Sequence, residues 1–337
     1  MARNRERRDH KIIAVTAGDP AGIGIEVSLK AFKELSDIAC IPVFIVRKSV
    51  LDSLYPNNNI DFIQIDSDYD PDDLLPNCIY LLNVELSYDV PIIGRGNINT
   101  GAESLAYIDK AIELWLNGKI DAIVTGPVSK AFINLNGVDF RGHTEYFAEK
   151  TGDLTPYMMM FSQDYRVILA TTHIPIQEVV SNLNEEKILD VLRVADKSLR
   201  MIDGSDPKIL PKIAVAGLDP HCGDDGAIGN FDTNITKNAI LKAREEGIQV
   251  DGPFAADTLF RAESWSNYSV VVAHYHDQGL IPFKMLAFDD GVNVTLGLKL
   301  IRTSVDHGTA FDIAGKNIAS YSSMVEAIKL AMKLQFV

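Results

Sequence analysis

Three of the seven histidines follow short apolar runs of the kind that form buried strands. They are His173, His221 and His276. In open α/β sheets, ligands bind outside the carboxyl ends of the strands, so we expect these side chains at one edge of a sheet. Three neutral imidazoles with one open coordination position suit Zn²⁺ and related transition ions better than Mg²⁺ or Ca²⁺. We therefore predict a divalent metal on the three histidines, although each one singly has the alternative role of a hydrogen-bonded structural residue.

Two neighbouring residues offer alternative metal ligands. His274 lies two positions before His276, so both side chains would share one face of a strand. We prefer His276 because it lies beyond the apolar run. Cys222 adjoins His221, and adjacent side chains seldom converge on one ion, so we expect Cys222 to have a packing role.

Basic residues in apolar surroundings predict an anion site. The net charge is −14, so an anionic substrate would need positive groups gathered locally. Lys284 and Arg302 interrupt apolar stretches, and such residues are rarely buried without a partner. That partner is either an anionic ligand or one of the 46 acidic residues. His143 lies on a glycine turn before a predicted helix that Thr144 can cap, which makes it a further candidate for binding a phosphate or carboxylate.

Two glycine-containing loops are candidates for contact with a ligand. The segment Gly18–Glu26 follows a predicted strand and opens a predicted helix, but its glycine spacing is not the G-x-G-x-x-G of a Rossmann domain. We interpret it as a tight strand–helix turn near the active site. The segment Asp306–Lys316 combines a Gly-Thr loop with polar groups, and its residues alone predict only a capped helix start.

Alternating strand and helix patterns predict an α/β fold. Continuous apolar runs, typical of strands in a covered parallel sheet, occupy residues 12–15, 43–46, 122–125, 167–170, 213–216 and 270–273. Helical periodicity occupies residues 102–116, 185–202, 233–246 and 322–334. A chain of 337 residues is expected to form two lobes. They are expected to be interwoven, because the strand series continues through both halves.

Composition excludes several classes of protein. No stretch reaches the roughly 18 apolar residues of a membrane-spanning helix. The basic residues 1–10 are interpreted as a frayed tail, because the apolar run after them is too short for a signal peptide. The negative net charge argues against nucleic-acid binding. Three cysteines without paired spacing predict no disulfides and a cytoplasmic location.

Taken together, the motifs resemble those of the 4-hydroxythreonine-4-phosphate dehydrogenase (PdxA) family, which includes the threonate and erythronate 4-phosphate dehydrogenases. The matching segments are Thr16–Gly24, Gly142–Glu145, Ala170–His173, Gly217–Gly223, Gly252–Phe260, Tyr275–Gly279 and Ile301–Ala310. They cover nearly the whole chain and stand in family order. Cys222 stands where the family is expected to have a small residue, directly after His221. The surroundings of the metal are therefore expected to differ from those in the family at this position.

The resemblance implies an activity and a set of site residues. It implies metal-dependent oxidation and decarboxylation of 4-phosphooxy-L-threonine to 3-amino-2-oxopropyl phosphate, in pyridoxal 5'-phosphate biosynthesis, with NAD or NADP. The metal, Zn²⁺ by preference with Mg²⁺ or Co²⁺ as alternatives, would be held by His173, His221 and His276. Implied substrate-binding residues are His143, Thr144, Lys284, Asn293 and Arg302. No general base is assigned.

The resemblance also implies a fold and an assembly. Residues 307–315 look like the nucleotide-binding loop of isocitrate and isopropylmalate dehydrogenases, which implies their two-lobed α/β fold with parallel or mixed sheets rather than a Rossmann domain. The implied cofactor residues are His307, Gly308, Thr309, Ala310 and Asp312. We expect residues 11–130 and 304–337 in the first lobe and 131–303 in the second, with the metal ligands and the dimer interface. A homodimer with an active site shared between subunits is implied.

Two alternative functions stay open at this point. The same chemistry can act on D-threonate 4-phosphate or D-erythronate 4-phosphate in sugar-acid breakdown, and no residue distinguishes these acids from the amino acid substrate. A protein of another class, a non-catalytic dimer that binds a metal or a phosphorylated ligand, is opposed by the intact set of ligand, anion and loop residues.

Overall fold

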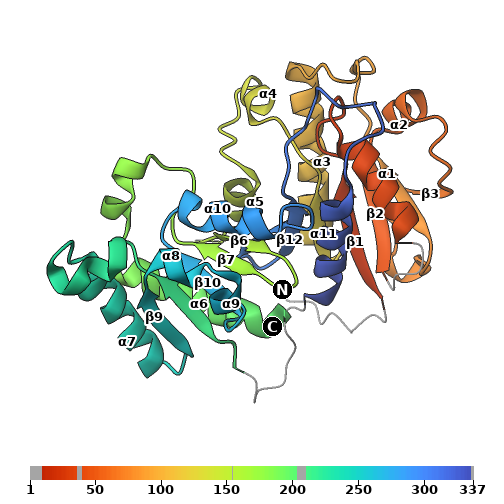
Figure 1. Ribbon diagram of the computed structural model, residues 1–337. Coiled ribbons are helices and arrows are strands. Elements are labelled where there is room, and N and C mark those ends of the chain that lie inside the picture. Colours follow the sequence, from red (N-terminus) through yellow and green to blue (C-terminus); the bar gives the residue numbers. More distant parts are fainter. Residues whose placement is uncertain (1–9, 36–39, 154, 203–209, 335–337) are drawn as a thin grey trace. The chain divides into compact units, whose positions relative to one another are not determined.

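The computed structural model describes residues 10–35, 40–153, 155–202 and 210–334. Within these residues the chain forms two compact units (Figure 1): unit 1 comprises 10–153 and 298–334, and unit 2 comprises 155–297. Both boundaries differ from the predicted ones at 130/131 and 303/304. The segment 131–153 stays in unit 1 because its helices pack on unit 1, and residues 298–303 stay there because their strand pairs within it. The predicted tail falls outside the described residues except for His10.

Unit 1 contains a parallel sheet in the order β3-β4-β2-β1-β5-β12. Its strands are β1 (Lys11–Thr16), β2 (Cys40–Val46), β3 (Phe62–Ile65), β4 (Ile79–Asn83), β5 (Ala122–Thr125) and β12 (Ile301–Val305). Its helices are α1 (Gly24–Glu34), α2 (Lys48–Leu54), α3 (Ile98–Leu116), α4 (Lys130–Asn134), α5 (His143–Thr151) and α11 (Ser322–Lys333). A short helical turn covers Pro71–Asp73.

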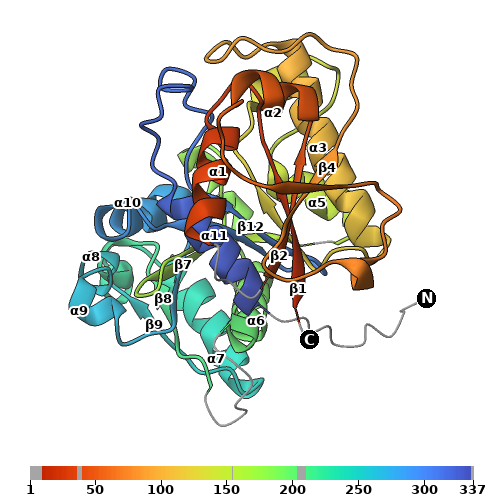
Figure 2. The same ribbon diagram turned by 90° about the vertical axis from the view of Figure 1, so that its right-hand side faces the viewer.

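Helices cover both faces of this sheet. The views in Figures 1 and 2 show α1 and α11 side by side on one face and α3 on the other, and α1 also packs on α11. Strands β2 and β5 are buried along their whole length, which is why their sequences are continuously apolar. The longest of these helices, α3, begins at a capping box in which the Asn97 side chain accepts from the backbone N–H of Thr100.

Unit 2 contains a mixed sheet in the order β11-β6-β7-β10-β8-β9. Its strands are β6 (Tyr157–Phe161), β7 (Arg166–Leu169), β8 (Ile213–Ala216), β9 (Val250–Phe254), β10 (Val270–Ala273) and β11 (Val292–Leu296). Its helices are α6 (Glu185–Ile202), α7 (Lys237–Glu245), α8 (Ala256–Leu259), α9 (Ala262–Trp265) and α10 (His276–Leu286). Strand β6 is antiparallel to β7 and β11, whereas β7, β10, β8 and β9 are parallel, so their carboxyl ends lie at one edge.

Alternating side chains give the unit 2 sheet two apolar faces. One face packs with α10, as a buried cluster that includes Val167, Leu169, Val271 and Phe283 shows. The helix α6 contacts β8, β10 and β11 and buries Ile188, Leu189, Val191, Leu192, Ala195 and Leu199 at helical spacing. With helices packed on it, this sheet holds the ends of β7, β8 and β10 in fixed positions.

The predicted architecture is confirmed. All six predicted apolar runs are strands, and the helix predicted at residues 185–202 is α6, with the Asn184 side chain accepting from the backbone N–H of Lys187 at its start. The helix predicted at 233–246 is a π-helical turn, Asp232–Thr236, followed by α7. Among the described helices, none has the length and apolar content needed to cross a membrane.

Candidate functional site

Two of the three predicted metal-binding histidines lie in contact at one edge of the unit 2 sheet. His173 follows β7 and His276 begins α10 after β10. Their ring centroids are 5.6 Å apart, with an angle of 43° between the rings. The carboxylate of Asp277 lies 2.7 Å from Nδ1 of His276, which leaves Nε2 as the free coordinating nitrogen. Within the described part of the chain, no three His, Cys, Asp or Glu side chains form a metal-binding group.

The third histidine, His221, follows β8 in an unusual backbone segment. Five consecutive residues, 221–225, have positive φ angles between 46° and 85°. For residues other than glycine this left-handed conformation costs roughly 1–2 kcal/mol each, so the surrounding structure must hold it. Gly223 is required because a Cβ there would lie 2.2 Å from the carbonyl oxygen of Gly229. The side chain of His221 is exposed, and the unusual backbone determines where it points.

A buried carboxylate, Asp232, holds the loop that leads to His221. It accepts hydrogen bonds from the backbone N–H groups of Leu218 and Asp219 at 3.0 and 2.9 Å, and from the hydroxyl of Thr236 at 2.8 Å. Its Oδ1 lies 3.8 Å from Nε2 of the buried His274. Burial lowers the pKa of His274 to about 4, against the opposing effect of Asp232, so the imidazole is neutral near pH 7. His274 therefore lies within the buried network beside Asp232 and Thr236.

The same buried network also joins the segments that follow β7 and β10. The side chain of Gln278 accepts from the backbone N–H of His274 and donates to the carbonyl of Gly217, both at 2.7 Å. The hydroxyl of Thr171 donates to the carbonyl of His274 at 2.7 Å. Because these groups lie on the segments that lead to His173, His221 and His276, one polar network fixes all three loops.

A cluster of basic groups in unit 1 contains two of the residues that were predicted for the anion site, Arg302 and His143. Arg302, on β12, is 2 % exposed, and its guanidinium donates to the hydroxyl of Thr125 at 2.7 Å. Burial lowers its pKa to about 9, with Glu145 acting in the opposite direction, so it stays protonated near pH 7. His143 begins α5, and its pKa is held well below the usual range by burial, then by Arg302 and Lys130. Its Nε2 has no hydrogen-bond partner among the described residues.

Lys130 is a member of this cluster that sequence reasoning missed. It begins α4, and its Nζ would lie 3.4 Å from a Cβ placed at Gly142. The available signal was the position of residues 126–130 directly after β5, where polar groups of α/β proteins meet ligands. Arg302 and Lys130, beside the neutral ring of His143, give the locally positive surroundings that an acidic chain needs for an anionic substrate.

The remaining predicted substrate-binding residues are distributed over both units. Thr144 belongs to α5 of unit 1, next to His143. Lys284, on α10, and Asn293, on β11, belong to unit 2. Oδ1 of Asn293 is buried and has no hydrogen-bond partner among the described residues. Such an oxygen can accept a hydrogen bond from a bound ligand.

The predicted cofactor loop packs against the glycine turn at the start of α1. The carbonyl of Thr309 accepts from the backbone N–H of Ile23 at 3.0 Å. A Cβ at Gly22 would lie 2.7 Å from that carbonyl, so only glycine permits this approach. Ala310 has a φ of 43°, and Asp312 is exposed one turn further on. The glycine turn therefore supports the loop that carries residues 307–312.

His307 has an unsatisfied polar atom within this loop. Its Nδ1 lies 3.0 Å from the carbonyl of Gly308, whereas its Nε2 is buried without a partner among the described residues. Burial lowers its pKa, so the ring is neutral near pH 7. A neutral imidazole of this kind can stack on a base or hydrogen-bond to a ribose.

Comparisons with known proteins agree over nearly the whole chain. The family model described as "Pyridoxal phosphate biosynthetic protein PdxA" matches residues 38–331. A 4-hydroxythreonine-4-phosphate dehydrogenase from Sulfurihydrogenibium sp. is 40% identical over 96% of this chain and 98% of its own. A D-threonate 4-phosphate dehydrogenase from Salmonella typhimurium is 37% identical over 96% and 99%. The crystal structure of 4-hydroxythreonine-4-phosphate dehydrogenase from Klebsiella pneumoniae is 37% identical, with a TM-score of 0.83 over 97% of this chain and 99% of that chain.

Proposed function

We propose that this chain, which belongs to the PdxA family, is a metal-dependent NAD(P) dehydrogenase that acts on a phosphorylated hydroxy acid. The proposed reaction oxidises and decarboxylates 4-phosphooxy-L-threonine to 3-amino-2-oxopropyl phosphate. The observation that carries this proposal is the basic cluster of unit 1, in which Arg302 is buried and His143 presents an unsatisfied ring nitrogen. The free cysteines and the net charge of −14 are compatible with the predicted cytoplasmic location.

The basic cluster would bind the anionic part of the substrate. Arg302 stays protonated although it is buried, so it attracts a phosphate or carboxylate without the screening that water provides. His143 is neutral, which allows its ring to donate one hydrogen bond without adding charge. Thr144, Lys284 and Asn293 are proposed as further contacts.

His173, His221 and His276 are proposed as the ligands of the metal, with Zn²⁺ preferred and Mg²⁺ or Co²⁺ as alternatives. The fit rests on the donor set: two of the rings lie in contact, and a buried network fixes the three loops. When bound, the metal supplies a Lewis acid that favours ionisation of the substrate hydroxyl and stabilises the charge that decarboxylation releases. The carboxylate of Asp277 would hold His276 in the tautomer that leaves Nε2 for coordination.

The loop residues His307, Gly308, Thr309, Ala310 and Asp312 are proposed to bind the cofactor, which takes up the hydride. The glycine turn at Gly22 packs against the carbonyl of Thr309 and so supports this loop. In the balanced reaction, the carbinol C–H bond breaks as hydride passes to the cofactor, and the hydroxyl loses its proton. The bond to the carboxylate then breaks to release CO₂, and the carbon that carried the carboxylate takes up one proton from the solvent.

A homodimer with a shared active site is part of this proposal. The helix α10 begins with His276 and presents large apolar side chains that are 43% to 80% exposed, namely Ile281, Met285 and Leu286; Phe288, just beyond it, is 73% exposed. Exposed apolar groups of this size, gathered on one segment, mark interaction surfaces. A second copy of the chain docked there would contact the helix that begins with the proposed metal ligand His276.

Steady-state kinetics with three acids test the substrate. The purified protein is assayed with 4-phosphooxy-L-threonine, D-threonate 4-phosphate and D-erythronate 4-phosphate, with NAD⁺ and with NADP⁺. We expect the highest kcat/KM with 4-phosphooxy-L-threonine. The relative from Salmonella typhimurium favours D-threonate 4-phosphate as the second candidate, and a higher kcat/KM with that acid would replace the first proposal. Binding without reduction of either cofactor would identify a non-catalytic dimer instead.

A further inference from the structure

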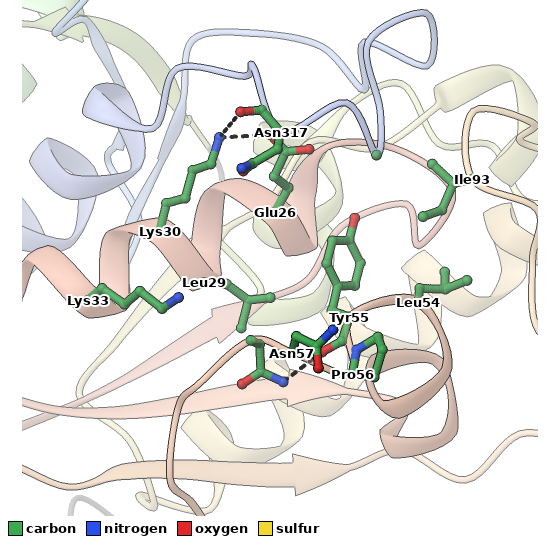
Figure 3. Close-up of a pocket in the computed structure, with 12 residues that line it drawn as sticks. Glu26, Leu29, Lys30, Lys33, Leu54, Tyr55, Pro56, Asn57, Ile93 and Asn317 are labelled. Atoms are coloured by element: carbon green, nitrogen blue, oxygen red, sulfur yellow. Dashed lines mark hydrogen bonds and ion pairs between the residues drawn. The ribbon is translucent and has the colours of Figure 1, made fainter.

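Lys130 lies in the basic cluster of unit 1, and its side chain is exposed. It begins α4 shortly after β5, and its ammonium group forms no hydrogen bond or ion pair within the described residues. Lys30, on α1 of the same unit, shows the usual arrangement of a lysine beside a carboxylate. Figure 3 shows its side chain reaching the backbone of Asn317, and its Nζ lies 2.8 Å from Oε1 of Glu26. Lys130 makes no contact of this kind with the described residues, so its charge is available to a ligand.

Neighbouring strands bring Lys130 and Arg302 into one cluster. Strand β12 pairs with β5, and the guanidinium of Arg302 donates to the hydroxyl of Thr125 at the end of β5, shortly before Lys130. A Cβ placed at Gly142, directly before α5, would lie 3.4 Å from Nζ of Lys130 and 2.9 Å from Oε2 of Glu145. The ammonium group therefore lies beside the first turn of α5, in the space that a glycine leaves open.

Lys130 supplies the net positive charge of this cluster. Arg302 is a buried cation, and the carboxylate of Glu145 acts on it with the opposite charge. His143 is neutral near pH 7, because burial and then the charges of Arg302 and Lys130 hold its pKa well below the usual range. Lys130 is therefore the cation whose charge is not offset by a carboxylate of the cluster. Cations gathered without a matching anion repel one another, so the arrangement favours an anionic ligand.

The start of α5 offers hydrogen-bond donors next to this cation. The helix covers nine residues from His143, and no described side chain caps the N–H groups of its first turn. Helix N-termini attract anions through these N–H groups. Nε2 of His143 is buried and has no hydrogen-bond partner among the described residues. A neutral imidazole can donate one hydrogen bond, so a positive charge and hydrogen-bond donors lie next to one another here.

We propose that Lys130 binds the substrate directly and gives the basic cluster its preference for a phosphate over a carboxylate. This role rests on the proposed function and adds a residue to the substrate-binding set. A phosphate monoester carries about −1.5 to −2 charges near pH 7, whereas a carboxylate carries a single one. Arg302, partly offset by Glu145, balances at most a single negative charge. The second charge of a phosphate therefore needs a second cation, and Lys130 is a compact point charge on a flexible stem.

Kinetics of Lys130 variants test the contact with the substrate. Lys130→Met removes the charge and keeps a side chain of similar length. We expect KM for 4-phosphooxy-L-threonine to rise about 10- to 30-fold, the loss of one charge-assisted hydrogen bond, with kcat and KM for the cofactor unchanged. Lys130→Arg keeps the charge and should restore most of the affinity. Lys150→Met, in the last turn of α5, is the matched control.

The pH dependence of inhibition tests which charge Lys130 recognises. Inorganic phosphate gains its second negative charge between about pH 5.5 and 8, whereas sulfate keeps two charges throughout. Over this range Arg302, with a pKa of about 9, stays largely protonated and His143 stays neutral. Comparison with sulfate removes any effect of the protein's own groups, including Glu145. We expect phosphate to become a stronger competitive inhibitor of the wild type as pH rises, relative to sulfate, and Lys130→Met to lose most of this change.

Binding measurements separate this role from the proposed function. If the wild type turns over none of the phosphorylated acids, the proposed function fails, and calorimetric titration of 4-phosphooxy-L-threonine into the wild type and Lys130→Met still measures the contact. Weaker binding by Lys130→Met, with Lys130→Arg and Lys150→Met close to the wild type, supports the assignment. It is overturned if the wild type does not bind the acid, or binds it no better than Lys130→Met. An equal rise of KM for substrate and cofactor, or the same change of phosphate inhibition relative to sulfate in both proteins, would also overturn it.

Discussion

The basic cluster of unit 1 and the histidine edge of unit 2 differ in what holds their side chains in place. In unit 1 the functional groups are themselves enclosed: Arg302 is 2 % exposed and bonded directly to Thr125. In unit 2 the histidine side chains are accessible, with His276 37% exposed, and the fixed part is the polar network beneath them. We therefore expect substitutions in the basic cluster to remove proposed contacts with the substrate directly. In unit 2, the polar network can be changed without replacing a proposed metal ligand.

The largest effect is expected from loss of a histidine at the edge of unit 2. His221→Ala should lower kcat/KM about 10³-fold, because Lewis-acid stabilisation contributes several kcal/mol and each 1.36 kcal/mol is tenfold in rate. The same variant should bind less metal, as measured by elemental analysis after gel filtration. His10→Ala serves as the control. Full turnover in His221→Ala, or in chelator-treated wild type, would contradict the metal role.

A large but more selective effect is expected in the basic cluster. Arg302→Lys keeps the charge but loses the planar guanidinium, so KM for the phosphorylated substrate should rise about 30- to 100-fold, which corresponds to a charge-assisted hydrogen bond. KM for the cofactor should stay constant. Arg141→Lys, on an exposed arginine paired with Asp139, is the matched control. An equal rise in both KM values would remove the assignment to the substrate.

An intermediate effect is expected from the network below the histidines. Gln278→Leu removes the hydrogen bonds to Gly217 and His274 without touching a metal ligand. Metal affinity should fall about 10- to 100-fold, as for other groups that orient ligands, in equilibrium dialysis with a competing chelator. The exposed Gln249→Leu is the control. Unchanged affinity in Gln278→Leu would show that the loops hold their positions without this network.

The smallest effect is expected for a buried acid in unit 1. Burial, against hydrogen bonds from Ala21 and Thr100, raises the pKa of Asp19 from 3.8 to about 6. Between these values only the unfolded chain is ionised, so stability falls as pH rises, by at most about 1.4 kcal/mol per pH unit for one group. Asp19→Asn should remove this component from urea unfolding curves between pH 4 and 6. The exposed Asp52→Asn is the control, and identical slopes in wild type and Asp19→Asn would contradict the raised pKa.

The sequence predicts most of the buried, continuously apolar strands, with β6 (YMMMF) missed, and predicts interrupted strands poorly. Strands β1, β5, β8 and β10 carry uninterrupted apolar runs, and all were predicted. By contrast, β12 contains Arg302 and β9 contains Gly252 and Pro253, residues that weaken a strand pattern. Strand β12 pairs with β5, and its arginine is buried there with a hydrogen bond to Thr125 of that strand.

The candidate site shows a similar division. Residues directly after strands, such as His173 and His276, were predictable because parallel strands bring their carboxyl ends together. The sequence did not predict the roles of Lys130, Asp232 and Gln278. These roles depend on contacts with residues far away in the sequence, such as the contact of Gln278 with Gly217. The left-handed segment after Pro220 was also not predicted, since Gly223, Asp224 and Asp225 each tolerate that conformation but none of them requires a run of five such residues.

The most direct test of the proposed function measures two products in one sample. Protein, divalent metal, NAD⁺ and 4-phosphooxy-L-threonine are incubated together, and the reduced nicotinamide formed and the CO₂ released are both quantified over the same interval. Oxidative decarboxylation predicts equal amounts of the two products. In Arg302→Lys, at a substrate concentration far below the wild-type KM, both products should fall together by about 30- to 100-fold. Binding of the substrate with no reduced nicotinamide and no CO₂, with NAD⁺ or with NADP⁺, would contradict the account.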